Sequence, residues 1–487
     1  TYISLKERPI TQKANYNSEP INNKIYGFNV NYSTEVPFLT RMVNKLPNID
    51  TDVPSNLSVR GEIAALRPGA PSGTDFQGVV TSYIDDFEGT QNAIDLKSPL
   101  SWFLSSRPDE LPNNILGDNT QGIQNGYGRA LLNWYNIDPI FYSNQRPSEI
   151  SDDDMSDLYT SRVFINELFP QQDIAQGQTA VINTLDLAYY PAERGPYNFQ
   201  TTQVDPSTNT LTQPQNSWAG ITRQITSTDF EQANVEYIEF WLQDPFQDNP
   251  TNPGGKLVFN LGNISEDVIK DGRKLYENGL PQDGDISGLT PTTFGTVVPQ
   301  NQSLIYAFDT TGGERTNQDV GYDGYDDMEE QVLEPIYSGL DDPANDNYSF
   351  FLNTSGDVFE RYKRYNGLEG NSPDTFSDTN RGSTNQPDVE DINRDNTMNT
   401  IDSYFEYELD LAPVDLTTDN PFIVDVKDSE ARLLPNGETV VPIWYLFRIP
   451  ISEFTRNVGG IADLRSIRFA RMFMREFTLS LIHISEP

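Results

Sequence analysis

The residues whose types and spacing best fit a chemical role lie between positions 391 and 402. Oxygen-bearing side chains recur there at the first, third, fifth, ninth and twelfth positions, and a backbone carbonyl is available at the seventh. This is the ligand spacing of an EF-hand-type calcium loop. The residues that we expect to bind a structural Ca²⁺ ion are Asp391, Asn393, Asp395, Thr397, Asn399 and Asp402.

This stretch departs from the full calcium-loop pattern. Asn396 stands where such loops have glycine, and Asp402 stands where they have the longer glutamate. Pro387 precedes the stretch and a predicted strand follows it, in place of two flanking helices. The alternative interpretation is a run of Asx turns, because Asp and Asn side chains bond readily to the backbone two residues on.

Two other acidic groups are weaker candidates. Asp319, Asp323, Asp326 and Asp327 form a second possible cation site, for which a solvated loop is the alternative. The carboxylates at positions 85, 86 and 88 would serve a glycosidase only if two of them flanked a sugar cleft.

Other catalytic chemistry has little basis in this sequence. The chain has no cysteine, and its one histidine is His483. It contains no nucleophile elbow, phosphate-binding loop, dinucleotide fingerprint or zinc-protease motif. We therefore predict no catalytic residue, no cofactor other than the calcium ion, and no enzymatic activity.

The charge of the chain excludes one class of partner. The formal net charge is −39, and such a field repels phosphate backbones. We expect no nucleic-acid binding. No stretch reaches the ~18 apolar residues of a membrane-spanning helix.

The strand patterns change along the chain. Residues 25–34 and 57–66 alternate strictly between apolar and polar side chains, which is typical of transmembrane β-barrel strands and also of half-buried strands in a soluble sheet. The apolar residues of 38–46 have helical spacing. A Gly/Pro/Ser-rich stretch, 67–78, then marks a boundary.

Many further strand candidates with long connections predict a mainly β fold, a jelly-roll-like sandwich similar to carbohydrate-binding modules. Expected strands include 83–87, 101–105, 180–190, 219–226, 235–242, 256–261, 304–308, 403–409, 422–427, 443–449 and 467–474. Helices are expected at 152–168 and 266–277. The five tryptophans could stack on sugars, but their strand-like or amphipathic contexts favour core packing for most of them.

These patterns predict three regions. Residues 1–75 form the barrel-type strand pair with its short helix, and residues 76–478 form the sandwich. The sandwich carries a helical insertion at about 125–170 and an Asp/Asn/Gly-rich insertion at about 281–400, which we interpret as an elaborate loop and not a second core. Residues 479–487 are expected to be a non-native tail without a partner surface, because SLIHISEP resembles a translated sequencing adapter.

Several long segments resemble one protein family, SprA, the gliding-motility protein that forms the outer-membrane translocon of the type IX secretion system. They are YGFNVNYSTEVPFLTRMVNKLP, SYIDDFEGTQNAIDLKSPLSW, NVEYIEFWLQDPF, LVFNLGNISEDVIKDGRKLYENGLP, ERYKRYNGLEGNSP, PDVEDINRDNTMNTIDSYFEYELDL and GGIADLRSIRFARMF. Family members are several times longer, so the resemblance implies an internal fragment.

The resemblance also implies a function and a location. The family forms a very large transmembrane β-barrel that conducts folded cargo across the outer membrane, with soluble domains inserted between its strands. The sandwich would be such a domain, an extracellular or periplasmic scaffold or docking module. The implied partners are the rest of the barrel, accessory outer-membrane and plug-type proteins, and secreted cargo. The alternative function is a secreted or surface-exposed carbohydrate-binding module.

Overall fold

A computed structural model describes residues 2–6, 22–67, 93–118, 122–170, 180–274, 280–291, 297–299, 304–309, 317–318, 321–365 and 386–482. The chain divides into two compact units. The first comprises residues 1–90 and 169–179, and the second comprises residues 91–168 and 180–487. The predicted strand at 83–87 and the carboxylates at 85, 86 and 88 lie outside the described residues.

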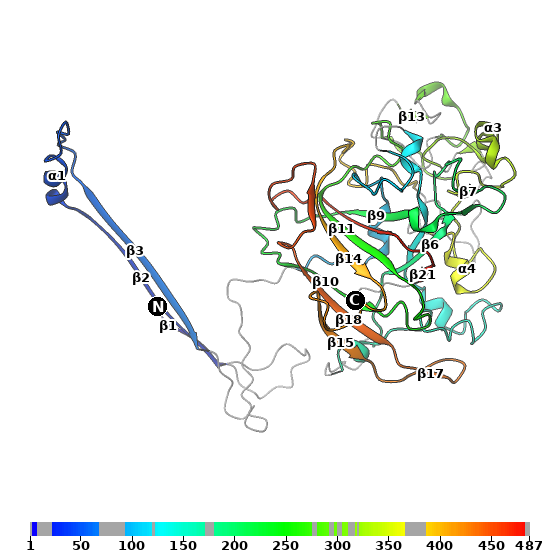
Figure 1. Ribbon diagram of the computed structural model, residues 1–487, viewed down its shortest axis with the longest axis horizontal. Helices are drawn as coiled ribbons and strands as arrows, with labels where there is room; N and C mark the ends of the chain where they lie inside the picture. The colour runs from blue at the N-terminus through cyan, green and yellow to red at the C-terminus, as the bar shows by residue number, and fades with distance from the viewer. Residues whose placement is uncertain are drawn as a thin grey trace. The chain divides into compact units, whose positions relative to one another are not determined.

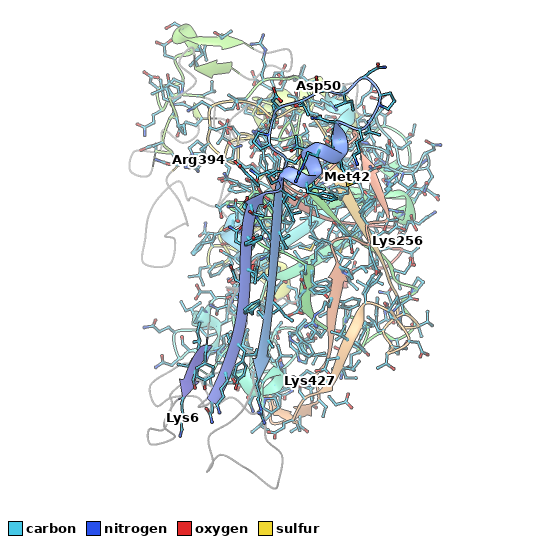
Figure 2. The ribbon with its side chains drawn as sticks, turned by 90° about the vertical axis from the view of Figure 1, so that its left-hand side faces the viewer. Lys6, Met42, Asp50, Lys256, Arg394 and Lys427 are labelled. Carbon is cyan, nitrogen blue, oxygen red and sulfur yellow. The ribbon has the colours of Figure 1, made fainter. Side chains whose placement is uncertain are left out.

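The first unit is a long antiparallel hairpin with a third strand at one edge. Strands β2 (Asn22–Glu35) and β3 (Asn56–Arg67) pair from Lys24↔Arg67 to Glu35↔Asn56. Helix α1 (Pro37–Val43) follows β2, and Figure 2 shows it at the end of the hairpin marked by Met42. Strand β1 (Tyr2–Lys6) pairs with β2. The predicted strand pair and short helix are confirmed.

The second unit is built from three larger antiparallel sheets. The largest has the order β19-β14-β11-β20-β9-β4, made by Arg456–Val458, Ser403–Leu411, Gly255–Asn263, Phe469–Arg475, Trp218–Gln224 and Phe103–Leu104. The next has the order β10-β18-β15, made by Tyr237–Gln243, Ile443–Pro450 and Ile423–Asp428. Figure 1 shows β11, β14, β10 and β18 within this unit.

The third sheet and two small hairpins complete the strands. The third sheet has the order β21-β6-β8-β7, made by Leu481–Ile482, Asp186–Arg194, Thr210–Leu211 and Val204–Asp205, and β5 (Ala130–Tyr135) also pairs with β6. The hairpins are β12/β13 (Leu289–Pro291, Val297–Pro299) and β16/β17 (Arg432–Leu433, Thr439–Val440).

The helices of the second unit are short. The α-helices are α2 (Ile165–Leu168), α3 (Asp327–Leu333) and α4 (Val358–Tyr362). The 3₁₀ helices are η1 (Pro99–Ser101), η2 (Ile123–Gly126), η3 (Pro139–Tyr142), η4 (Pro214–Asn216), η5 (Ile286–Gly288) and η7 (Pro335–Tyr337). Among the described helices, none is long and apolar enough to cross a membrane.

The main core is formed by side chains from all three larger sheets. Phe259 of β11 lies 5.4 Å, centroid to centroid, from Phe240 of β10, which stacks at 5.1 Å on Phe447 of β18. Alternate residues of β14 and β20 also join this core. The predicted mainly β, sandwich-type fold is therefore confirmed.

The helix predicted over 152–168 is wrong except for its last turn, α2. Hydroxyl and carboxylate side chains bond to the local backbone instead: Ser156 Oγ donates to the Asp152 carbonyl at 2.5 Å, and Thr160 Oγ1 donates to the Asp154 carbonyl at 2.9 Å. Such bonds stabilise turns in competition with a helical ladder.

The helix predicted over 266–277 is absent from its described part, residues 266–274. Side-chain carboxylates accept the amide protons there. Glu390 accepts from the backbone N–H groups of Val268 (2.8 Å) and Ile269 (3.0 Å), and Asp267 accepts from that of Gly272 (2.9 Å). The strand predicted at 304–308 is also wrong, because residues 304–309 have no strand pairing.

The 281–400 region contributes buried side chains despite its polar composition. Phe351, Val358 and Tyr362 belong to a satellite core together with Tyr135 and Phe141. At the other end of the chain, Leu481 is buried in the main core and pairs with Tyr189 of β6. The expectation that the residues after 478 have no partner surface is therefore wrong for Leu481.

Candidate metal centre

The first turn of α3 positions a cluster of carboxylate side chains that could bind a metal ion. Asp326 caps this helix by accepting from the backbone N–H of Glu329 at 2.8 Å, and Glu329 reaches back to the Asp326 N–H. This capping box fixes the first turn. Asp327 and Glu330, three residues apart, consequently lie on one face of the helix.

Two sets of three carboxylates converge on that face. Asp323, Glu330 and Asp346 each place a carboxylate oxygen within 4.8 Å of the other two, and all three are buried. Asp327, Glu330 and Asp342 form a second set with the same spacing, so Glu330 belongs to both. We call these five residues the acidic cluster.

Backbone amides hold most of the carboxylates in place. Glu330 Oε2 accepts from the Ala344 N–H at 2.8 Å, and Asp342 Oδ1 accepts from the Asp346 N–H at 3.1 Å. Asp323 Oδ1 accepts from the Tyr325 N–H at 3.3 Å. The cluster is therefore built from two chain segments, 321–330 and 342–346, with fixed ligand directions.

One oxygen of the acidic cluster has no partner among the described residues. Asp346 is 2% exposed, and no described donor reaches its Oδ2, although the Tyr197 side chain forms a hydrogen bond with the Asp346 carboxyl group. A Cβ added at Gly321 would lie 2.2 Å from Asp346 Oδ2 and 3.0 Å from Asp323 Oδ1. Both oxygens therefore face the Gly321 backbone, which leaves room for them only because position 321 has no side chain.

Few positive groups compensate the acidic cluster. Arg364 Nη1 lies 3.1 Å from Asp342 Oδ2, and the Arg364 side chain is 54% exposed. Arg194 is buried nearby, but its guanidinium donates to Asn209 Oδ1 and to the carbonyls of Asn198 and Pro343.

Burial and mutual repulsion disfavour the charged forms of these carboxyl groups. Burial, together with the charge of Asp342, raises the pKa of Asp323 to about 7. Burial and the charge of Asp346 raise the pKa of Glu330 to about 11. Burial and the charge of Asp323 raise the pKa of Asp346 well above its ordinary value. Without a counter-ion, this cluster destabilises the fold once it ionises.

The stretch predicted to bind calcium, 391–402, has a different geometry. Asp391 Oδ2 accepts from the Asn396 N–H at 2.8 Å and lies 3.6 Å from Lys274 Nζ. Asn393 Oδ1 accepts from the Asp395 N–H at 2.9 Å, and Asp395 Oδ1 accepts from the Thr397 N–H at 2.8 Å. The bonds accepted by Asn393 and Asp395, each from the amide two residues on, are Asx-turn bonds.

The remaining predicted ligands of that stretch point elsewhere. Asn399 Nδ2 donates to Glu266 Oε2 at 2.6 Å. Asp402 Oδ1 accepts from the Ser265 N–H at 3.3 Å and lies 3.6 Å from Arg471 Nη1. Among the described residues, neither set of three converging carboxylates includes Asp391, Asp395 or Asp402. Calcium binding by this stretch remains a prediction.

A comparison with known protein families matches the part of the chain that holds the 391–402 stretch and most of the acidic cluster. Residues 324–482 match the family model SprA_N, described as motility related/secretion protein. Over these residues the chain is similar to the SprA family, and we call residues 324–482 the SprA segment. No curated protein matches the chain. The family resemblance seen in the sequence is thus confirmed over this range.

The SprA segment contains four of the five acidic-cluster residues, since only Asp323 precedes it. Sequence reasoning selected Asp323 and Asp327 but missed Glu330, Asp342 and Asp346. The capping box Asp326–Glu329 was a usable signal for Glu330, because it predicts a helix that aligns Asp327 with Glu330. No local pattern pointed to Asp346.

The stability of the fold should depend on pH through Glu266, which contacts the predicted calcium stretch of the SprA segment. Burial, opposed by bonds from Asn399 and reinforced by the charge of Asp391, raises its pKa to about 7. The folded chain therefore binds the proton more tightly than the unfolded chain, and stability falls as pH rises from ~4.3 to about 7. We expect Glu266→Gln to reduce the loss of melting temperature between pH 5 and pH 8.

The matched control is Glu453→Gln, since Glu453 is exposed. Thermal melts at the two pH values should give the same loss for this variant as for the unmodified chain. An unchanged loss in Glu266→Gln would show that Glu266 does not carry this dependence.

Proposed function

We propose that this chain is a non-enzymatic part of an outer-membrane protein-export translocon of the type IX secretion system. In this proposal, the hairpin of the first unit contributes strands to a transmembrane β-barrel. The second unit is a scaffold or docking domain inserted between barrel strands. The match of residues 324–482 to a motility and secretion family supports a role in motility or secretion. The apolar face of the hairpin is the observation that supports a place in a transmembrane barrel.

The two faces of the β2–β3 hairpin differ sharply in chemistry. Opposed pairs Phe28↔Ile63 and Tyr32↔Val59 lie on one face, and Asn29↔Glu62 and Asn31↔Arg60 lie on the other. Phe28 is 64% exposed and Ile63 is 66% exposed. An exposed apolar face of this kind needs a cover, which a lipid bilayer supplies.

The length of the hairpin also fits a membrane. At ~3.3 Å per residue, twelve paired positions span about 40 Å, and a strand tilted by ~45° then covers a height of about 28 Å. The apolar band of a transmembrane barrel is ~25 Å tall. One crossing by each strand is therefore sufficient.

Single-cysteine labelling tests the proposed membrane face. The chain has no cysteine, so Phe28→Cys and the adjacent control Asn29→Cys each introduce one labelling site. With a fluorescent label and the full chain in lipid–detergent micelles that contain doxyl-labelled lipid, we expect strong quenching at position 28 and weak quenching at position 29. The pair Ile63→Cys and Glu62→Cys should behave likewise.

Equal quenching at neighbouring positions would contradict the proposed face. Absence of quenching at positions 28 and 63 would contradict membrane contact altogether. Either result would leave the hairpin as a soluble strand pair and would remove the main support for the barrel role.

The second unit has a surface suited to docking in its SprA segment. Three apolar side chains of α3 are exposed: Met328 (72%), Val332 (77%) and Leu333 (50%). Figure 1 shows α3 at the opposite end of this unit from β15 and β17. The partners that we propose for the whole protein are the rest of the barrel, accessory outer-membrane and plug-type proteins, and secreted cargo.

The alternative function, a carbohydrate-binding module, has less support from the structure. Sugar-binding sandwiches need exposed aromatic rings on which sugars stack. All five tryptophans are buried, although core packing was predicted for most of them only, and the most exposed, Trp241, is 6% exposed. The second unit exposes Tyr237 (46%) and Phe454 (42%). The scaffold interpretation is therefore preferred.

A further inference from the structure

We propose that Asp323, Glu330 and Asp346 bind a calcium ion that fastens the α3 segment to the sandwich. This inference does not depend on the proposed role in export. It rests on the converging carboxylates, on the unpartnered oxygen of Asp346, and on the chemistry of the ligand set.

The spacing of the carboxylates suits calcium. Ca²⁺ binds oxygen ligands at ~2.3–2.6 Å, so two ligands on opposite sides of the ion lie ~4.6–5.2 Å apart and other pairs lie closer. One oxygen from each of Asp323, Glu330 and Asp346 lies within 4.8 Å of the others. The three groups can therefore reach a common ion with little movement.

The unpartnered oxygen is the second, independent observation. In the described part of the chain, no group donates a hydrogen bond to Asp346 Oδ2, although the residue is 2% exposed. A buried carboxylate oxygen without a partner is strongly destabilising. Asp346 Oδ2 and Asp323 Oδ1 both face Gly321, so the unsatisfied oxygen is directed into the cluster and not toward solvent.

The protein cations of the described residues do not supply the missing charge. Among the described residues, the salt bridge of the acidic cluster is the one between Arg364 and Asp342, and no salt bridge reaches Asp323, Glu330 or Asp346. Buried charges are normally paired or bind metals. A divalent ion would neutralise two of these carboxylates and satisfy Asp346 Oδ2 in one step.

The ligand set selects the kind of ion. All the converging atoms are carboxylate oxygens, which are hard donors preferred by calcium and magnesium over softer transition metals. Asp327 and Asp342 flank the trio and share Glu330 with it. Calcium accepts six to eight oxygens in flexible geometry, whereas magnesium requires near-ideal octahedral geometry and keeps several waters. The buried, multi-carboxylate cluster therefore suits calcium.

The ion would connect two chain segments to the core. The Tyr197 N–H donates to the Ala344 carbonyl at 2.9 Å, and the Tyr322 N–H donates to Tyr197 Oη at 2.8 Å. Tyr197, Tyr322 and Ala344 belong to the main core. Because Asp323 and Glu330 come from one segment and Asp346 from the other, bound calcium would hold both segments against this part of the sandwich.

Thermal melts of the full chain test the site. All five tryptophans lie in the second unit, so tryptophan fluorescence follows the unfolding of that unit alone. After treatment with EDTA and its removal, we expect millimolar CaCl₂ to raise the melting temperature by several degrees over NaCl of equal ionic strength. Equal melting temperatures in the two salts would overturn the proposal.

Neutral isosteric variants locate the ion. Asp346→Asn and Asp323→Asn should weaken calcium binding at least tenfold and abolish most of the thermal shift. In EDTA, Asp346→Asn should melt at or above the temperature of the unmodified chain, because it removes one of the repelling charges. Retention of the full calcium shift by Asp346→Asn would overturn the proposal.

Two controls separate this site from its surroundings. Asp326→Asn keeps a good helix cap outside the carboxylate sets, so it should retain the shift. Asp391→Asn should also retain it; loss of the shift in Asp391→Asn alone would place the ion in the 391–402 stretch and overturn the proposal.

A direct binding measurement covers the case in which the Asn variants fail to fold. Tb³⁺ binds calcium sites and luminesces when a nearby tyrosine is excited, and Tyr322 and Tyr325 adjoin the ligand Asp323 in sequence. We expect Tb³⁺ luminescence with the unmodified folded chain and its displacement by Ca²⁺. Absence of this competed signal would overturn the proposal.

Discussion

Replacing Arg432 with methionine is expected to destabilise the second unit by about 3–5 kcal/mol. Arg432 and Glu167 form a buried pair, with each side chain 4% exposed. Arg432 Nε donates to Glu167 Oε1 at 3.1 Å and Nη2 donates to Glu167 Oε2 at 2.5 Å. The variant leaves the Glu167 carboxylate buried without its cation, which is more costly than the pair itself is stabilising.

The pair also joins distant parts of the chain. Arg432 starts the β16–β17 hairpin and Glu167 lies in α2, where its Oε1 accepts from the Phe164 N–H at 2.9 Å. Urea denaturation followed by tryptophan fluorescence measures the loss of stability.

The double variant Arg432→Met/Glu167→Leu is the decisive control. Replacing both charges with apolar groups of similar size should recover most of the lost stability, because no buried charge remains. If the double variant is as unstable as Arg432→Met alone, the loss arises from packing of the arginine stem and the electrostatic explanation fails.

The strands could be predicted from the sequence because their signal is local. Residues 403–409 alternate between apolar and polar side chains, and the structure places them in β14 (Ser403–Leu411). The hairpin was predicted in the same way and is confirmed by a register that keeps Phe28 opposite Ile63. An alternation of apolar and polar side chains can be recognised from a few consecutive residues, without knowledge of distant contacts.

The helix predictions failed where side chains compete with the helical ladder. Residues 152–168 contain many Asp, Ser and Thr side chains, and residues 266–274 contain Asp267 and Asp271. Such side chains bond to nearby amides and carbonyls. In the second case the competing carboxylate includes Glu390, which is more than 120 positions away in the sequence from the amides that it accepts from. A local pattern contains no information about such a partner.

The acidic cluster was only partly predictable for the same reason. Asp323 and Asp327 stood out because acidic residues crowd that stretch of sequence. Asp346 is brought close to them only by the fold. The Ala344 N–H, two residues before Asp346, donates to the Glu330 carboxylate and holds the two segments together. Conversely, the calcium-loop spacing of 391–402 was visible in the sequence, yet its side chains form Asx turns that spacing alone does not distinguish from ligation.

The second large effect is expected in the core between the sheets. Phe447 of β18 is fully buried and stacks on Phe240 at 5.1 Å with an interplanar angle of 6°. Phe447→Ala removes an aromatic ring and leaves a cavity, and such changes cost about 3–5 kcal/mol. Phe447→Leu keeps most of the volume and should cost less. Urea denaturation of the full chain, followed by tryptophan fluorescence, measures both losses.

Val424 of the neighbouring strand β15 provides the matched control, because its side chain is 48% exposed. Val424→Ala should change stability by less than ~0.5 kcal/mol. The dependence of unfolding free energy on urea should keep its slope in all three variants, since the surface exposed on unfolding is nearly the same. A loss below 1 kcal/mol for Phe447→Ala would contradict a sandwich core closed at this position, since removal of a ring at a mobile, solvent-accessible site leaves no cavity.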